Sequence, residues 1–326
     1  MCTLHLIENG VNVGFEAGRI NVGNSDRTSV PIEAVDGLKI YGKPLITTYC
    51  IEECMKKGIP ISFFSSTGGY IGGFTSTYIN VKRQRIQSLF NSTYTSFVLA
   101  KKIIYAKVIN QLTVLRRYNR TSDECILDII KSIKHIIKKI DFANDIHQLM
   151  GYEGIAARYY FEGLSRVVKK ELSFSGRSKC PPKDHFNALL SFGYSLLYNE
   201  MYGVIVNRGL NPYFGFIHED KENHPALVSD MIEEWRAVIV DSMVMSLING
   251  NEISLDDFEV GKGFYLNNIG RKKVINKYNK KMDTKTSYIL NNQSITYRKA
   301  LDYQIQSLVH VIEEDDAFLY SPIMIR

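Results

Sequence analysis

The sequence predicts an α+β protein in which a small β-rich N-terminal domain is followed by a larger all-α C-terminal domain. Over residues 1–80, short apolar runs are broken by Gly, Asn and Asp, which is typical of strands and turns. From about residue 84 onward, apolar residues recur every three to four positions in long runs, which is typical of helices. This change of period predicts a domain boundary near residue 80, separating domains 1–80 and 81–326.

The N-terminal domain is expected to hold one helix among its strands. The strand candidates are "LHLI", "VNVGF", "RINV", "LKIYG" and "IPISFFS". The stretch "PLITTYCIEECMKK" predicts a helix at about 44–57 that ends at Gly58. Gly68-Gly69 suggests a tight hairpin. A phosphate-binding glycine loop is the alternative, but "SSTGGYIGGF" lacks both the GxxxxGK[ST] and the GxGxxG pattern.

The C-terminal domain is expected to be built from long helices. The run "RIQSLFNSTYTSFVLAKKIIYAKVINQLTVLRRY" carries apolar residues at helical spacing over about eight turns. Further helical runs are "DECILDIIKSIKHIIKKI", "GIAARYYFEGLSRVV", "HFNALLSFGYSLLYNEMYGVIV", "PALVSDMIEEWRAVIVDSMVMSLI" and "YRKALDYQIQSLVHVIEE". No internal repeat or low-complexity segment interrupts them.

Positive charge is concentrated in the first helices. The net charge of the chain is +6, yet residues 82–139 hold thirteen Lys and Arg residues against three acidic ones. Residues 1–80 are slightly acidic. A local excess of this kind is the footprint of a surface that contacts a phosphate backbone. A set of solvated helix faces is the alternative explanation.

Cysteine usage and hydropathy favour a cytoplasmic protein without a membrane segment. The five cysteines are scattered, and the start "MCTLHLIENG" has neither a positive region nor a long apolar run. We therefore expect reduced thiols. Cys50 and Cys54 lack a second pair at zinc-finger spacing, so no structural zinc site is expected. No stretch of 18 apolar residues is present.

The segment "GFIHEDKENHPALVSDMIEEWR" raises the possibility of a metal site. His218 lies in a polar loop, and Asp230 and Glu233 follow at i, i+3 spacing on a predicted helix. Two neighbouring carboxylates and an imidazole suit a divalent cation such as Mg²⁺ or Mn²⁺. The alternative is an amphipathic surface helix whose acidic side is solvated, and helix geometry alone favours it.

Glu153 in "MGYEGIAARYYF" is the candidate for a third ligand. Its neighbours Gly151, Gly154, Ala156 and Ala157 are small, so a helix or a ligand can approach closely. The alternative is that Glu153 occupies the first turn of a helix, where a negative charge meets the positive end of the helix dipole.

The order of several segments carries a resemblance over nearly the whole chain. These are "GYEGIAARYYF", "PPKDHFNALLSFGYSLLY", "GLNPYFGFIH", "HPALVSDMIEEWR" and "YSPIMIR". The sequence resembles the CRISPR-associated integrase and endonuclease of spacer acquisition. The resemblance implies that Glu153, His218 and Glu233 are catalytic metal ligands, with Asp230 and Asn187 supporting the site. It also suggests three candidate DNA phosphate contacts: Arg177, Lys183 and Arg236.

The resemblance further implies an activity and a set of partners. The expected enzyme uses Mg²⁺ or Mn²⁺ and inserts short foreign DNA into a CRISPR array through attack of a 3′-hydroxyl on a repeat phosphodiester. Expected partners are double-stranded and branched DNA, a second copy of the chain, and a small ferredoxin-like adaptation protein that completes a heterohexamer. Two alternatives stay open, namely a non-catalytic DNA-binding scaffold and another metal-dependent phosphoesterase.

Overall fold

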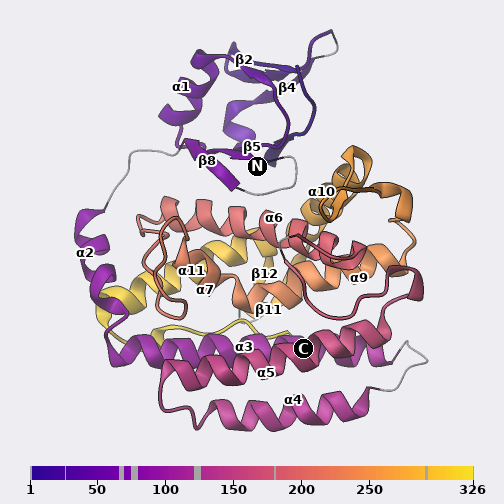
Figure 1. Ribbon diagram of the computed structural model, residues 1–326. Coiled ribbons are helices and arrows are strands. Elements are labelled where there is room, and N and C mark those ends of the chain that lie inside the picture. The colour runs from indigo at the N-terminus through magenta and orange to yellow at the C-terminus, as the bar shows by residue number, and fades with distance from the viewer. Residues whose placement is uncertain are drawn as a thin grey trace. The chain divides into compact units, whose positions relative to one another are not determined.

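The computed structural model describes residues 2–25, 27–65, 70–74, 80–120, 126–179, 181–290 and 293–325. They form two compact units, Met1–Ile79 and Asn80–Arg326, drawn in Figure 1. The first is rich in strands and the second is mainly helical, so the predicted α+β class is confirmed. The expected hairpin at Gly68-Gly69 lies outside the described residues.

Two four-stranded sheets make up most of the first unit. One has the order β1 (Cys2–Leu6), β5 (Val35–Ile40), β7 (Ile61–Phe64) and β8 (Tyr70–Phe74). The other has the order β4 (Thr28–Pro31), β3 (Arg19–Val22), β2 (Asn12–Glu16) and β6 (Leu45–Ile46). Strands β1, β5 and β7 are parallel, and β8 pairs antiparallel with β7. The 3₁₀ turn η1 (Ile32–Ala34) leads into β5.

A single apolar core joins both sheets to the helix α1 (Thr48–Lys56). Val13 and Ile20 enter it from one sheet and Leu38 from the other, and all three are fully buried. Helix α1 begins later than the predicted position 44, because Leu45 pairs with Asn12 as part of a strand. Thr47 then caps the helix by accepting a hydrogen bond from the Cys50 backbone N–H at 3.2 Å.

Helices form most of the second unit, together with short hairpins. The helices are α2 (Val81–Phe90), α3 (Tyr94–Asn119), α4 (Leu127–Ile140), α5 (Ile146–Val167), α6 (His185–Asn207), α7 (Ala226–Met231), α8 (Glu233–Trp235), α9 (Ser242–Asn249), α10 (Asn268–Met282) and α11 (Tyr297–Glu314). The short turns are η2 (Lys170–Leu172), η3 (Arg236–Asp241), η4 (Leu255–Asp257) and η5 (Ala317–Leu319). Helices α3, α4 and α5 lie side by side in Figure 1.

The first predicted helical run is split into two helices. Helix α2 ends at Phe90, and Thr93 starts α3 by accepting a hydrogen bond from the Ser96 N–H at 3.1 Å. The hydroxyl of a threonine at a helix N-cap satisfies one of the free N–H groups of the first turn. Two hairpins were also not expected among these helices. They are β9 (Phe258–Val260) with β10 (Phe264–Leu266), and β11 (Lys285–Leu290) with β12 (Gln293–Thr296).

Most residues of the segment from Ala226 to Asn249 are buried, including those on its acidic side. It is not one α-helix: α7, α8, the π-helical turn η3 and α9 follow one another. Asp230 and Glu234 are 0% exposed, and Asp241 is 1% exposed. The interpretation of these acids as the solvated face of a surface helix is therefore wrong.

Part of the basic segment does form a solvated face. In α4, five isoleucines face the core while Lys131, Lys134, Lys138 and Lys139 are exposed. Lys101 and Lys102 of α3 donate to backbone carbonyls of Asp141 and Ala317. Within the described ranges, none of the helices is both long and apolar enough to span a membrane.

A close helix crossing in the second unit predicts a sharp effect on stability. A Cβ atom on Gly193 of α6 would lie 2.6 Å from Val240 Cγ1, and Val240 is fully buried. We expect Gly193→Ala to lower the free energy of unfolding by about 1–3 kcal/mol, because the core must shift to accept the methyl group. Gly203→Ala is the matched control on the same helix, since nothing lies within 4 Å of its added Cβ. The control is expected to gain up to about 1 kcal/mol. Urea unfolding measures the free energy of unfolding of both variants. Equal values would contradict the close contact between Gly193 and Val240.

Candidate active site

A pocket of about 670 Å³ lies among α3, α5, α6 and the α8–η3 segment. Its walls combine carboxylates with several cations, and His218 lines it as well. The cationic lining residues are Lys107, Arg158, Arg177, Lys179 and Arg236. A concave site in which acids and bases converge is the usual setting of a catalytic or ligand-binding centre.

Glu153 lines this pocket from the middle of α5. The helix begins at Ile146, capped by Asp145, so Glu153 lies two turns inside it. The explanation of Glu153 as a first-turn acid near the helix dipole is therefore wrong. Gly154 and Ala157 line the same pocket, which leaves room beside the carboxylate.

Lys107 of α3 connects Glu153 to Glu233. Its ammonium forms a hydrogen-bonded ion pair with Glu153 Oε1 and lies 2.5 Å from Glu233 Oε2. Only 9% of its side chain is exposed. Burial lowers the pKa of Lys107, but the two carboxylates outweigh burial and raise it above its ordinary value. Lys107 is therefore a charged, nearly buried member of the site.

Glu233 of α8 is held as a carboxylate by two cations. Arg236 Nε donates to Oε1 at 3.0 Å, while Lys107 faces Oε2. Burial alone would raise the pKa of Glu233. The positive charges of Arg236 and Lys107 outweigh burial and lower the pKa to about 2. The Oε2 atom is buried and receives no hydrogen bond of good geometry, in spite of its ion pair with Lys107.

Glu234 points away from the pocket, although it is the next residue. Its carboxyl accepts hydrogen bonds from the Ile323 N–H at 2.9 Å and from Tyr320 and Gln304. Burial raises the pKa of Glu234 to about 8, and these hydrogen bonds only partly oppose the rise. The two adjacent glutamates therefore face different surroundings, and only Glu233 lines the pocket.

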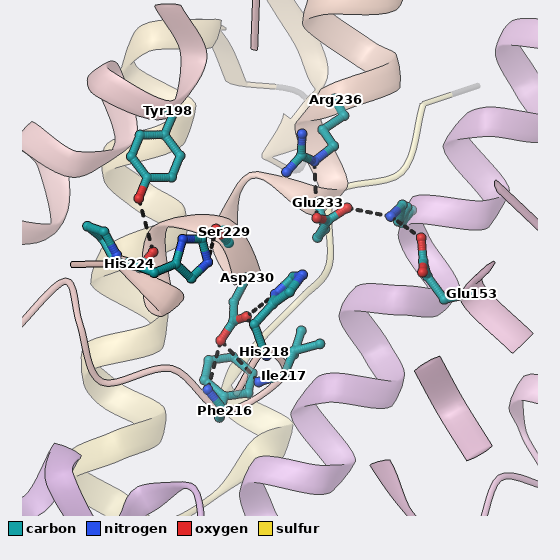
Figure 2. A network of polar contacts seen from close by, with 12 residues as sticks. Glu153, Tyr198, Phe216, Ile217, His218, His224, Ser229, Asp230, Glu233 and Arg236 are labelled. Atoms are coloured by element: carbon teal, nitrogen blue, oxygen red, sulfur yellow. Dashed lines mark hydrogen bonds and ion pairs between the residues drawn. The ribbon is translucent and has the colours of Figure 1, made fainter. Parts of the chain in front are cut away.

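Asp230 of α7 fixes the position of His218. Its carboxylate accepts hydrogen bonds from the backbone N–H groups of Phe216, Ile217 and His218 at 2.7, 3.1 and 3.0 Å. His218 Nδ1 lies 2.7 Å from Asp230 Oδ1, and a dashed line joins the two side chains in Figure 2. Because a carboxylate can only accept, the proton belongs on Nδ1, and Nε2 keeps its lone pair. Gly215 permits this contact, since a Cβ there would lie 2.9 Å from Asp230 Oδ2.

Asn187 of α6 acts on the pocket through Arg177. Its Oδ1 atom accepts hydrogen bonds from Arg177 Nη1 at 2.8 Å and from the Ser178 N–H at 3.0 Å. Asn187 is fully buried and does not line the pocket, whereas Arg177 does. Lys183 is exposed and lies outside the lining of the pocket.

A buried Asp–Tyr cluster packs behind the arginines. Asp241 accepts hydrogen bonds from Tyr194 at 2.5 Å and Tyr160 at 2.7 Å. The guanidinium groups of Arg236 and Arg177 lie 4.8 and 5.3 Å from the centre of the Tyr194 ring. Contacts of this kind between a cation and an aromatic face restrict both arginines.

The structure thus brings Glu153, Glu233 and His218 to one pocket, with Asp230 and Asn187 behind it. Within the described residues, no three His, Cys, Asp or Glu side chains stand close enough to form a metal-binding group, and Lys107 pairs with both glutamates of the pocket. The donor atoms nevertheless suit Mg²⁺ or Mn²⁺, since they include a buried carboxylate oxygen without a hydrogen-bond donor and an imidazole nitrogen.

Sequence reasoning missed Lys107, Arg158 and Lys179. Among the thirteen Lys and Arg residues of 82–139, charge alone does not distinguish Lys107. A sequence signal was nevertheless present. Lys107, Asn110 and Gln111 are polar residues at helical spacing on the otherwise apolar, buried side of α3. Arg158 and Lys179 are exposed, and nothing in their local sequence distinguishes them from other surface cations.

Comparisons with known proteins agree on one family. Residues 4–280 match the family described as CRISPR associated protein Cas1. A CRISPR-associated endonuclease Cas1 of Mycobacterium tuberculosis is 33% identical over 96% of this chain and 94% of its own length.

Two solved structures share the fold. A casposase bound to integration product aligns with a TM-score of 0.84 and 24% identity, over 97% of this chain and 92% of that one. A chain of a Cas6-RT-Cas1–Cas2 complex aligns with a TM-score of 0.83 and 23% identity. That alignment covers 99% of this chain and 36% of the other, so this chain spans about a third of that protein.

The environment of Asp241 predicts a pH dependence of stability. Burial raises the pKa of Asp241 to about 6, although the bonds from Tyr194 and Tyr160 and the nearby arginines lower it. The folded state therefore binds the proton of the Asp241 carboxyl more tightly than the unfolded state does. The stability gained from this protonation is complete below about pH 4. The contribution is lost as the pH rises through about 6.

We therefore expect the stability of the wild type relative to Asp241→Asn to fall by up to about 3 kcal/mol between pH 4 and pH 7. Denaturant unfolding across this range measures the difference. The exposed Asp220 provides the control, since Asp220→Asn is expected to leave the profile unchanged. A difference between wild type and Asp241→Asn that does not vary with pH would contradict the assignment.

Proposed function

The chain belongs to the CRISPR-associated Cas1 family, and from that premise we propose that it is a metal-dependent DNA endonuclease and integrase that inserts short DNA fragments into a CRISPR array. The observation that carries the proposal is the pocket in which Glu153, Glu233 and His218 meet five cationic side chains. Carboxylates and an imidazole can hold a divalent cation, while the cations can hold the phosphates of DNA.

Glu153, His218 and Glu233 would hold Mg²⁺ or Mn²⁺. A divalent ion bound there would supply Lewis-acid stabilisation of the negative charge that develops on the scissile phosphate. Asp230 would keep His218 in the tautomer whose Nε2 can bind a metal, as carboxylates commonly do behind metal-binding histidines.

The arginines and lysines would bind and orient DNA. Arg236 and Arg177 have their guanidinium groups fixed over Tyr194, and Asn187 holds Arg177 from behind. Fixed guanidinium groups suit phosphate oxygens because their donors form a planar fork. Exposed Lys179 and Arg158 would contact phosphates farther along the strand, and Lys183 is a further candidate contact outside the pocket.

The proposed reaction is a direct transesterification. The oxygen of a DNA 3′-hydroxyl forms a bond to phosphorus while the bond from phosphorus to the leaving 3′ oxygen breaks. The attacking hydroxyl loses a proton and the leaving oxygen gains one. Water in place of the hydroxyl gives strand cleavage by the same exchange. The solved structure of a casposase bound to integration product, which shares this fold, supports the choice of chemistry.

The proposed assembly includes DNA and two kinds of protein partner. We propose a homodimer formed through the first unit, joined by a small ferredoxin-like adaptation protein in a heterohexamer on double-stranded or branched DNA, in the cytoplasm. The similarity to a chain of a Cas6-RT-Cas1–Cas2 complex supports a protein partner. The four exposed lysines of α4 offer a basic surface for duplex contacts beyond the pocket.

Substitution of His218 is the direct test of this function. We expect His218→Ala to lower strand transfer and cleavage of a branched DNA with a free 3′-hydroxyl by at least about 100-fold in Mn²⁺ or Mg²⁺, because a metal ligand is lost. EDTA should abolish both reactions. His224→Ala is the control, because His224 contacts Ser229 and does not line the pocket.

Equal activities of wild type and His218→Ala would instead favour a phosphoesterase whose chemistry lies elsewhere. DNA binding without any metal-dependent chemistry, even after the adaptation partner is added, would favour a scaffold.

The salt dependence of DNA binding tests the cationic lining. We expect Lys179→Ala to weaken binding of unrelated duplexes by a similar factor. The slope of log affinity against log salt should fall in magnitude by about one, since one phosphate contact is lost. Lys170→Ala provides the control, because Lys170 is exposed and lies outside the lining of the pocket. Fluorescence anisotropy at several salt concentrations gives both slopes. Unchanged slope and affinity in Lys179→Ala would remove Lys179 from the proposed contacts.

A further inference from the structure

Lys107 occupies the position between the two proposed acidic ligands. Glu153 and Glu233 lie on two different helices, as Figure 2 shows, and the Lys107 ammonium forms ion pairs with both carboxylates. The lysine reaches this position from α3, which packs against both α5 and α8. The oxygens that Lys107 contacts, Glu153 Oε1 and Glu233 Oε2, are among those available to a metal ion.

The charges at this position are already balanced. Glu153 and Glu233 carry two negative charges, and Lys107 and Arg236 carry two positive charges in contact with them. A divalent cation would add two positive charges to a region where Glu233 is 4% and Lys107 8% exposed. Unbalanced charge in such surroundings is strongly unfavourable.

An anion in the pocket would remove this imbalance. A metal ion on Glu153 and Glu233 deprives the Lys107 ammonium of both partners, and a buried cation needs a new one. Lys107 lines the same pocket as Arg177 and Lys179, which are suited to bind DNA phosphate. The flexible four-carbon chain of a lysine can turn its ammonium from a carboxylate to a neighbouring phosphate.

We propose that Lys107 couples the binding of metal to the binding of DNA. In the free protein its ammonium competes with the metal for Glu153 and Glu233. When a DNA phosphate enters the pocket, the ammonium pairs with the phosphate and releases the carboxylates. Metal and DNA then strengthen the binding of one another by the same factor, as linkage requires. This inference rests on the proposed metal-dependent function and adds a condition to it: the site loads its metal readily only when substrate is present.

Binding of Mn²⁺, without any measurement of activity, tests the proposal. The full-length protein is titrated with Mn²⁺ by calorimetry and by electron paramagnetic resonance. Each titration is repeated with a phosphorothioate duplex lacking 3′-hydroxyls, which keeps the backbone charge and resists cleavage. The variants are Lys107→Met, which removes the charge at similar length, and Lys107→Gln, which keeps a donor for Glu153. Lys107→Arg keeps the charge, and Lys179→Met removes a charge elsewhere in the pocket.

Without DNA, we expect Lys107→Met and Lys107→Gln to bind Mn²⁺ about tenfold or more tighter than wild type, because the competing cation is gone. DNA should tighten Mn²⁺ binding to the wild type by about tenfold or more, and clearly less in these two variants. Lys107→Arg should resemble the wild type. Without DNA, Lys179→Met should increase the affinity for Mn²⁺ clearly less. It removes a positive charge from the pocket but leaves Lys107 paired with the two carboxylates.

Several results would overturn the proposal. Equal or weaker Mn²⁺ binding by Lys107→Gln without DNA would show that Lys107 does not compete, even if Lys107→Met fails to fold. If Lys179→Met increased the affinity for Mn²⁺ as much as Lys107→Met, the increase would reflect only the loss of one positive charge from the pocket. These results leave the proposed function intact if His218→Ala weakens Mn²⁺ binding. If the wild-type protein bound no Mn²⁺ with or without DNA, both the proposed function and this inference would be contradicted.

Discussion

The second unit is organised around the burial of carboxylates. Four acidic side chains of one helical segment, Asp230, Glu233, Glu234 and Asp241, are almost completely enclosed. A buried carboxylate is strongly unfavourable unless donors or cations surround it. Each of the four therefore requires partners from another part of the chain, and the positions of those partners determine how the helices meet.

The partners come from widely separated segments. Asp230 holds the loop that ends at His218, Glu233 is paired by Lys107 of α3, and Glu234 binds the chain near Ile323. Asp241 binds two tyrosines, one from α5 and one from α6. The acidic residues that form the proposed site are thus inseparable from those that stabilise it. A change to any partner alters both the packing and the electrostatic environment of the pocket.

The fold class and most of the helices could be predicted from the sequence. Glu153, His218 and Glu233, selected as metal ligands, line one pocket, and their role there stays a prediction. Periodicity identifies an apolar stripe, and the full-length resemblance selected the site residues. Neither could reveal that the opposite, acidic side of Ala226–Asn249 is also buried, because local spacing does not say what packs against a helix. For the same reason Lys107 was counted with the surface charges, although it lies in the centre of the site. The N-cap at Thr93 was visible in the sequence and would have divided α2 from α3.

The contacts of the C-terminal segment impose an order on synthesis and folding. Asn110 donates to the Ile323 carbonyl and accepts from the Ile325 N–H, 215 residues later in the chain. Glu234, adjacent to Glu233, accepts from the Ile323 N–H. On the ribosome, α3 emerges long before residues 323–325, so the buried polar atoms of Asn110 and Glu234 gain these partners only after those residues are made. The helices can associate earlier, but the surroundings of Glu233 are complete only after residue 325 has left the exit tunnel. Until then, a nascent chain carries the proposed site with the surroundings of Glu233 incomplete.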